Sequence, residues 1–516
     1  MNYTTDNRKL NLPVIIVLGI FAILALLLVS WDSYFYDLWQ HHDVIWFYTC
    51  GKAWMNGMTP YVDFADSKGP LLWLIYGIGY LMSPHDYIGM YWLACVLYTF
   101  IFWMCYKCAR LFVKDVRLGL MAVVLSSLYF LSGLTHIEVR AEDYCYALML
   151  PVFYRFLRHN VAHESGYRFA RQSAIVLGLA LGLTLLIKYS CTLMLAIFIP
   201  YFCIVVPRRC GYPVWRAMGW CALTGIAVML PMLGWLAYKG CLTDFINEYF
   251  LITFNTFDNM KGNELTVGNV FYMFLGKRVI LFTLTLIAGI VAYCKVVGKG
   301  WPMAVTALLW FMAVILLNGT DRIYLNVLSL FTVLFAGIVT QVFSRWLRWW
   351  SVNAVLAVGV LALLFATVDH KSLFVQQLPD REIWYYYPSL MSQYESPRVL
   401  YLMCHDHGEG VPVHGLPACK YWSMQEGHTP EMVEDQINTV KQHRCDVAFI
   451  KAEDTDMAQL LEVNGYHRYD FTDAGLGEKS WNERFIMYSL KPLKTNTNVY
   501  PSPTEVLLKR NVVLRR

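Results

Sequence analysis

The chain has 516 residues, of which 57% are hydrophobic and 15% are charged, and its formal net charge is +5. Soluble domains average about 45–50% apolar and about 25% charged residues, so this composition excludes an ordinary cytosolic enzyme. The 34 Tyr, 29 Phe and 18 Trp exclude a disordered chain. The basic residues are spread over many loops, which argues against a nucleic-acid partner. The composition predicts a polytopic α-helical membrane protein surrounded by membrane lipids.

Eleven apolar runs predict membrane-spanning helices. The first, residues 11–30, carries no charge and is followed by no small-residue cleavage site, so it predicts a retained span and no signal peptide. The others are residues 88–106, 118–135, 143–157, 172–187, 189–207, 217–238, 279–294, 300–317, 323–344 and 349–368. The run 143–157 has the weakest pattern, because Arg155 lies near its end.

The outer loop after the first span, residues 31–70, is the densest in polar and aromatic residues. Asp43 begins a run of helical period that includes Val44, Phe47 and Trp54, which predicts an interfacial helix along the membrane surface. A carboxylate at a helix N-terminus stays ionised because of the helix dipole. Capping of the helix would explain this Asp equally well.

A motif follows Asp43 over residues 51–70, G-K-A-x-x-x-G-x-x-P-Y-x-D-x-x-D-x-K-G-P. With the preceding acid, it resembles the bacterial GT-C-fold glycosyltransferases, relatives of protein O-mannosyltransferases and aminoarabinose transferases. The resemblance implies a GT-C fold, a polyprenyl-phosphate-linked sugar as donor, and a reaction at the outer face of the membrane. It also implies that Asp43 is the catalytic carboxylate, although Val44 stands where the family usually has a second acid.

The end of this motif places Asp66 and Lys68 directly before a twelfth apolar run, residues 69–83. Lys68 would either extend to lipid headgroups or neutralise a lipid phosphate, and both it and Asp66 are candidates for substrate binding. If 69–83 does not cross the membrane and the N-terminus is inside, seventeen basic residues are cytoplasmic and nine lie in outer loops. The run therefore predicts an interfacial or re-entrant helix.

The second outer loop, residues 135–144, holds Glu138, Arg140, Glu142 and Asp143. These charges could be solvated caps, which is the favoured interpretation of Glu138. The resemblance implies that one acid here faces the active site, and Glu142 or Asp143 matches. Glu142 is the second catalytic candidate, and Arg140 and Asp143 are candidates for substrate binding. A carboxylate here could bind a divalent cation with Asp43 or orient acceptor hydroxyls. The sequence therefore does not decide whether a metal is bound, and no other cofactor is expected.

Two further outer turns carry candidate phosphate ligands. Lys188 lies between two apolar runs in a turn too short to form a hydrophilic loop, and ionisable groups at such a depth are functional candidates by default. Snorkelling to headgroups is the competing interpretation. Arg322 and Tyr324 match the family's basic and aromatic turn, and Arg322 could bind the phosphate bidentately or pair with Asp321.

Eleven spans put the C-terminus outside, so the chain divides into a GT-C transmembrane module, residues 1–369, and an exported domain, residues 370–516. Alternating strands and helices predict a small α/β domain, with a loose end over 491–516. The predicted strands are 398–404, 446–452 and 484–490, and the predicted helices are 429–443 and 455–465. Cys404, Cys419 and Cys445 could include one disulfide.

The sequence favours an inner-membrane glycosyltransferase that inverts the anomeric configuration by in-line displacement, with a protein, lipid or polysaccharide as acceptor. A secondary transporter or flippase is the main alternative, and a non-catalytic scaffold is a third. Transporters usually show internal repeats and charges at the bilayer midplane. Here the candidate charges gather at the ends of the spans assigned to the outer face, while the span centres are nearly uncharged.

Overall fold

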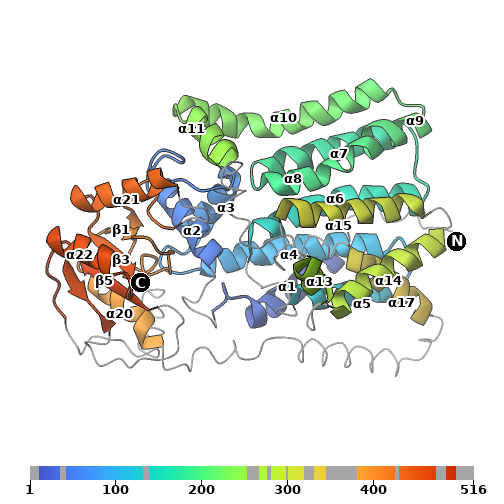
Figure 1. Ribbon diagram of the computed structural model, residues 1–516. Helices are drawn as coiled ribbons and strands as arrows, with labels where there is room; N and C mark the ends of the chain where they lie inside the picture. The colour runs from blue at the N-terminus through green and yellow to red at the C-terminus, as the bar shows by residue number, and fades with distance from the viewer. Residues whose placement is uncertain are drawn as a thin grey trace. The chain divides into compact units, whose positions relative to one another are not determined.

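The computed structural model describes residues 11–34, 42–131, 139–252, 267–275, 280–297, 300–318, 331–344, 381–424, 429–471 and 484–495. The chain forms two compact units (Figure 1). The helical unit comprises Met1–Tyr36, Ser67–Ile75 and Met90–Leu373, and the sheet unit comprises Asp37–Asp66, Tyr76–Gly89 and Phe374–Arg516.

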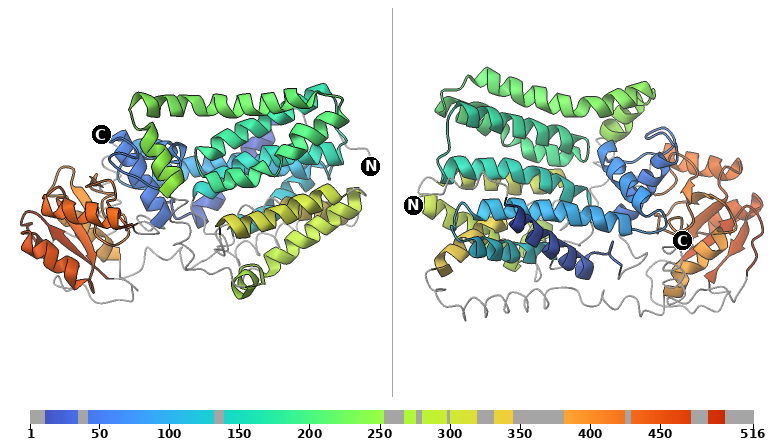
Figure 2. Two further views of the ribbon diagram at one scale, coloured as in Figure 1. Left: turned by 45° about the horizontal axis from the view of Figure 1, so that its top comes forward. Right: turned by 180° about the vertical axis from the view of Figure 1, so that it is seen from behind.

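The helical unit is built from long apolar helices joined by short connections. Its elements are α1 (Leu12–Val29), α4 (Ile88–Ala109), α5 (Val116–Leu131), α6 (Ala141–Val161), α7 (Tyr167–Leu185), α8 (Tyr189–Ala196), the π-helical η2 (Tyr201–Val205), α9 (Val206–Arg209), α10 (Val214–Tyr238), α11 (Leu242–Ile246), the π-helical η3 (Asn247–Ile252), α13 (Val267–Leu275), α14 (Ile280–Val297), α15 (Trp301–Asn318) and α17 (Thr332–Ser344). Helices α7 and α10 lie side by side in both views (Figure 2).

Glycines allow α7 and α10 to pack closely. A Cβ atom on Gly178 would lie 2.1 Å from the carbonyl oxygen of Cys221, and one on Gly182 would lie 2.4 Å from that of Gly225. Small residues at such positions let membrane helices approach through backbone contact, without a hydrophobic driving force between them. This contact fixes the position of α7, whose C-terminal end leads into Lys188.

Three described helices, α1, α4 and α10, are long and apolar enough to cross a membrane. The bent pair Tyr189–Ala196 and Tyr201–Arg209, with a 42° angle between its parts, would make a fourth. Ten of the eleven predicted runs coincide at least in part with helices of the described segments, and the run 349–368 lies outside them. The count of eleven spans therefore stays a prediction.

Helix α3 (Pro70–Met82) occupies the ambiguous apolar run. Its 13 residues are about 20 Å long, against about 30 Å for the hydrocarbon core of a bilayer. Helix α3 is too short to cross, as the distribution of basic residues predicts.

The sheet unit has a five-stranded mixed sheet in the order β2-β1-β3-β5-β4. Strands β2, β1 and β3 are parallel, whereas β5 runs antiparallel to both β3 and β4. The strands are β1 (Arg398–Tyr401), β2 (Leu416–Pro417), β3 (Val447–Lys451), β4 (His467–Tyr469) and β5 (Phe485–Ser489), and the helices are α2 (His42–Met55), α20 (Arg381–Met391), α21 (Pro430–Lys441) and α22 (Thr455–Val463).

The three predicted strands and two predicted helices of this unit are present within the expected ranges. Thr429 and Asp454 begin α21 and α22 by accepting backbone hydrogen bonds from Met432 and Met457, at 3.3 and 3.2 Å. Strands β2 and β4 and helix α20 are not predicted from the sequence, because two of them are very short and α20 is interrupted by Pro388. All fourteen cysteines are free, including the three for which a disulfide was open.

Helix α2 differs from its prediction. The sequence predicts an interfacial helix with one face on the membrane surface, but every side chain from Val44 to Ala53 is buried. Its aromatic side chains are covered by protein, and Phe47 and Tyr48 pack on the rings of Tyr76 and Tyr87, at 5.6 and 4.9 Å between centroids. The helical period of this run therefore marks a helix enclosed by the sheet unit.

Candidate functional site

Asp43 lies in the first turn of α2 and is partly exposed. It is the acidic residue of a helix whose next ten side chains are buried, so its position is fixed by the packing of the whole helix. The helix ends at Met55, and the following Gly57 has a φ of +89°, a backbone conformation that glycine adopts without strain. The chain therefore turns at Asn56-Gly57.

The loop after β1 holds α2 by two buried hydrogen bonds. The Thr49 hydroxyl donates to Asp406 Oδ2 at 2.8 Å, and Lys52 Nζ donates to the Gly410 carbonyl oxygen at 3.0 Å. Asp406 is itself fixed, because its Oδ1 accepts from the Gly408 backbone N–H at 2.8 Å. The motif lysine Lys52 is thus a buried anchor of α2 in the sheet unit.

Burial shifts the titration of groups around this anchor. The Lys52 side chain has no solvent exposure, and burial lowers its pKa to about 8, opposed by the charge of Asp406. Burial raises the pKa of Glu409 to about 7, and the Asp406 charge acts in the same direction. Tyr401 donates to Glu409 Oε2 at 2.9 Å. Both shifts bring buried groups towards neutrality near physiological pH.

Three histidines come together beside Asp43. The ring of His42 lies 5.2 Å from that of His405 and 5.1 Å from that of His407, between centroids. His407 packs on the Phe485 ring at 4.0 Å, and burial lowers its pKa to about 3, so it stays neutral. The sequence analysis did not detect this group, because residues 42 and 405–407 are more than 360 positions apart. Among the described residues, no three His, Cys, Asp or Glu side chains are arranged to hold a metal ion.

A second set of candidates lies in the helical unit, at the start of α6 and the end of α7. Lys188 and Glu142 form an ion pair, in which the two side chains are 11% and 6% exposed. The structure therefore gives Lys188 a protein partner, which the snorkelling interpretation does not include. It also separates the two acidic candidates of this loop, because only Glu142 pairs with this cation.

Asp143 accepts two hydrogen bonds from the surrounding protein. Its Oδ2 accepts from the backbone N–H of Arg140 at 2.9 Å and completes the cap of α6. Its Oδ1 accepts from the Tyr98 hydroxyl at 3.3 Å. Arg140 is the N-cap residue and is only 1% exposed. Asp32, which follows α1 and is 2% exposed, acts electrostatically on the same Tyr98 hydroxyl.

The motif residues 68–70 are joined to the turn that carries Lys188. The backbone N–H groups of Gly69 and Leu71 donate to the carbonyl oxygens of Ile187 and Leu186, at 2.9 and 3.0 Å. A Cβ atom on Gly69 would lie 2.1 Å from the Leu186 carbonyl oxygen, so only glycine fits this approach. The backbone next to Lys68 is thereby joined to the turn of Lys188, and both ammonium groups act electrostatically on the Tyr189 hydroxyl.

Aromatic side chains from a distant segment pack against Tyr189. Tyr249 of η3 is fully buried, donates to the Leu185 carbonyl oxygen at 2.8 Å, and packs on the Tyr189 ring at 5.7 Å. Asp66 is 8% exposed and belongs to the sheet unit, whereas Lys68 belongs to the helical unit. The predicted ligands Arg322 and Tyr324, and also Glu138, lie outside the described residues.

Two solved structures share this architecture over nearly the whole chain. One is ArnT from Cupriavidus metallidurans bound to undecaprenyl phosphate, with a TM-score of 0.55 and 14% sequence identity. The other is the apo state of the same protein, with a TM-score of 0.55 and 12% identity. Each comparison covers 93% of this chain and 98% of the ArnT chain. The chain has the GT-C fold.

The structural similarity to ArnT includes most of both units, because the comparison covers 93% of this chain. The fold that the motif at residues 51–70 predicts is therefore confirmed. A search with protein-family models and a search of curated protein sequences match nothing.

Proposed function

We propose that this chain is an inner-membrane glycosyltransferase that transfers a sugar from a polyprenyl-phosphate donor to an acceptor hydroxyl at the outer face, with inversion. The observation that carries the proposal is the approach of Lys68 and Lys188 at Tyr189, in a chain of GT-C fold. Two cations close together at the end of apolar helices suit the phosphate of a lipid-linked donor. ArnT, which shares the fold, has been solved with undecaprenyl phosphate bound.

In the proposed reaction the acceptor oxygen attacks the anomeric carbon while the bond from that carbon to the phosphate oxygen breaks. Asp43 accepts the proton of the acceptor hydroxyl. The polyprenyl phosphate leaves with the bonding electron pair, and Lys68 and Lys188 stabilise the negative charge that develops on it. A phosphate leaving group stabilised in this way needs little protonation, so one base and two cations are sufficient.

Glu142 positions Lys188 in this proposal. Its carboxylate pairs with the ammonium group when no donor is bound, and this pairing holds the lysine side chain at the turn. Ordering of the lysine before the donor arrives lowers the entropic cost of phosphate binding. Glu142 is then a positioning residue and no longer the second catalytic candidate.

The sheet unit has a role in the same proposal through α2. The bonds from Thr49 to Asp406 and from Lys52 to Gly410 hold the helix that begins with Asp43. We assign the sheet unit the function of positioning the base.

The test is donor turnover by the purified full-length protein. A panel of polyprenyl-phosphate sugars is incubated with the protein and hydroxyl acceptors, and released polyprenyl phosphate is measured. We expect turnover of at least one donor, with inverted configuration in the product. A transporter or flippase would release no polyprenyl phosphate, and that result with the whole panel would contradict the proposal.

The role of Asp43 is tested with Asp43→Asn, which keeps the size and the capping ability of the side chain. Loss of general-base catalysis should lower turnover about 10²- to 10⁴-fold. The matched control is Asp63→Asn, since Asp63 lies in the same loop, is exposed and accepts from the Thr59 backbone N–H at 2.6 Å. Turnover of Asp43→Asn within a few-fold of the parent protein would make Asp43 a helix cap only.

A further inference from the structure

The helical unit has a second charged region, at the end of α7 away from Lys188. Helix α7 runs from Tyr167 to Leu185, so its 19 residues separate the two ends by about 28 Å. Figure 1 shows α9 beside this end of α7 and beside the start of α10, and the three helices are in contact. This region is therefore distinct from the proposed donor site.

Positive charge is in large excess here. The segments 106–117, 154–173 and 207–216 contain eleven Lys and Arg residues but only two acidic residues, Asp115 and Glu164. The sequence predicts that this end faces the cytoplasm, where loops of membrane proteins are enriched in basic residues.

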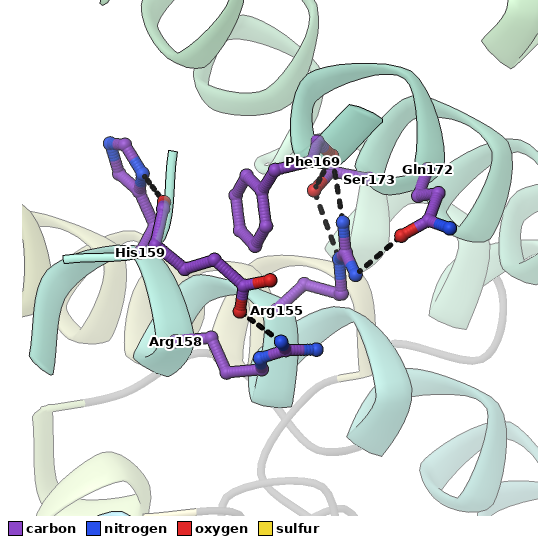
Figure 3. Close-up of polar contacts among 7 residues, drawn as sticks. Arg155, Arg158, His159, Phe169, Gln172 and Ser173 are labelled. Carbon is purple, nitrogen blue, oxygen red and sulfur yellow. Dashed lines mark hydrogen bonds and ion pairs between the residues drawn. The ribbon is translucent and has the colours of Figure 1, made fainter. Parts of the chain in front are cut away.

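The Arg155 guanidinium donates its hydrogen bonds to groups inside the protein, as Figure 3 shows. It donates to Ser173 Oγ at 3.0 Å and to the Phe169 carbonyl oxygen at 2.7 Å, and its guanidinium lies 4.1 Å from the Phe169 ring centroid. Arg158, one turn along α6, forms an ion pair with Glu164. Arg155 thus joins α6 to α7, and Arg158 pairs with one of the two acidic groups of the region.

Lys107 and His159 lie within the electrostatic reach of arginine side chains in this region. Lys107 lies 4.8 Å from the ring centroid of Tyr154, and the two arginines of α6 repel its charge. Arg209 likewise repels the imidazole of His159. Five arginines of α7, α9 and α10 are exposed: Arg168, Arg171, Arg208, Arg209 and Arg216. An anion at this place would relieve the repulsion.

Exposed aromatic residues place this region at the level of lipid headgroups. Trp215 is 70% exposed and Tyr167 is 62% exposed, and Trp and Tyr are enriched where membrane proteins cross the headgroup layer. The guanidinium of Arg216 lies 5.0 Å from the Trp215 ring centroid. Helix α10 continues from here as an apolar helix of which only 11% is buried in protein, so it offers a surface for acyl chains.

We propose that the ends of α7, α9 and α10 bind the headgroup of an anionic phospholipid, with Arg208, Arg209 and Arg216 contacting the phosphate and the acyl chains lying along α10. Basic pockets between membrane helices on the cytoplasmic side bind lipid phosphates in this manner. A free anion would gain the charge but not the apolar contact with α10, which favours a lipid as the source of the phosphate.

The experiment compares two variants at the opposite ends of α10. Arg216→Gln removes a cation beside Trp215, and the control Lys239→Gln removes an exposed cation whose Nζ lies 6.0 Å from the Trp235 ring centroid. Detergent-solubilised full-length protein is mixed with phosphatidylglycerol or phosphatidylcholine, and retained lipid is measured by native mass spectrometry. We expect Arg216→Gln to weaken phosphatidylglycerol retention about fivefold, the effect of one surface charge, and the control to have no effect.

The double variant Arg208→Gln with Arg209→Gln should weaken retention of phosphatidylglycerol further and leave that of phosphatidylcholine unchanged. Both residues are exposed, so neither change removes a buried contact. Inorganic phosphate at millimolar concentration should displace little lipid if acyl chains contribute, and full displacement would identify an anion site without a lipid. Equal retention of the two lipids by the parent protein, or equal losses in Arg216→Gln and Lys239→Gln, would overturn the proposal.

Discussion

Lys188 is a buried cation, so a substitution there changes both the stability of the protein and the proposed binding of the donor phosphate. Its partner Glu142 is 6% exposed, so removal of the lysine alone leaves a carboxylate with little access to water. Breaking a buried ion pair from one side typically costs about 3–5 kcal/mol, whereas replacing both partners by neutral groups of similar volume is often neutral.

We therefore predict different outcomes for a single and a double variant. Lys188→Ala should lower thermal stability and abolish polyprenyl-phosphate binding. Lys188→Met with Glu142→Gln should restore the unfolding temperature of the parent protein but still bind polyprenyl phosphate at least tenfold more weakly. Unfolding temperature and binding are measured on the same preparations. Donor binding restored in the double variant would show that the pair is structural only.

The raised pKa of Glu409 makes the folding stability of the sheet unit depend on pH. Burial raises this pKa from 4.5 to about 7, so the folded state binds a proton more tightly than the unfolded state. The resulting stability is fully present below pH 4.5 and is lost as the pH rises through 7. The contribution of Lys52 to stability depends on pH in the opposite direction. Burial lowers its pKa to about 8, so stability increases as the pH rises from 8 to 10.5.

We predict that Glu409→Gln stabilises the protein relative to the parent at pH 7.5 but not at pH 4.5. The glutamine oxygen can still accept from Tyr401, and it carries no charge to be desolvated. One pKa unit is about 1.4 kcal/mol, so the gain is at most about 3 kcal/mol. The measurement is the unfolding temperature of both proteins at the two pH values. A difference that does not change with pH would contradict the raised pKa of Glu409.

Helix α2 is the element whose position matters most for the proposed reaction. It carries Asp43 at one end and is held by Thr49 and Lys52 further along, both bonded to the loop after β1. A substitution at Lys52 removes the donor of the buried Gly410 carbonyl, which typically costs about 1–3 kcal/mol.

We predict that Lys52→Met lowers turnover at least tenfold while the affinity for polyprenyl phosphate changes less than threefold. The reason is that the anchored helix carries the base, whereas Lys68 and Lys188 belong to the helical unit. Lys441→Met is the control, because Lys441 is exposed in the same unit. Hydrogen exchange of residues 42–55 should increase in Lys52→Met only. Normal turnover together with faster exchange would show that Lys52 supports stability without positioning Asp43.

For the whole molecule, the sheet unit constrains the membrane topology. Residues 42–66 share this unit with residues 398–424, as the bond from the Ala65 N–H to the Lys420 carbonyl oxygen at 3.1 Å shows. Two segments of one unit lie on the same side of the membrane, so the chain between them crosses an even number of times. If α1 crosses as well, the total is odd, and the predicted eleven spans satisfy this condition.

We predict that cysteines introduced as Met58→Cys and Lys441→Cys both react with a membrane-impermeant maleimide in intact spheroplasts. A cysteine introduced as Arg171→Cys, exposed at the basic end of α7, should react only after permeabilisation. The parent protein measures the background, since twelve of its fourteen cysteines are buried. Protection of both Met58→Cys and Lys441→Cys would reverse the orientation, and a difference between them would contradict the unit itself.

The sequence by itself determined the membrane class, the positions of most helices, the non-crossing α3, three strands and the GT-C fold. These features depend on local quantities: the length of an apolar run against the thickness of a bilayer, the period of side chains, and a motif of contiguous residues. Tertiary structure decided that α2 is enclosed, that Glu142 and not Asp143 pairs with Lys188, and that Gly69 brings Lys68 to the same turn. It also showed that Lys52 is buried and bonds to the Gly410 carbonyl oxygen. The partners of these residues lie between 46 and 358 positions away along the chain, except for the cap that Asp143 forms, and no local pattern specifies which distant group will satisfy a buried charge.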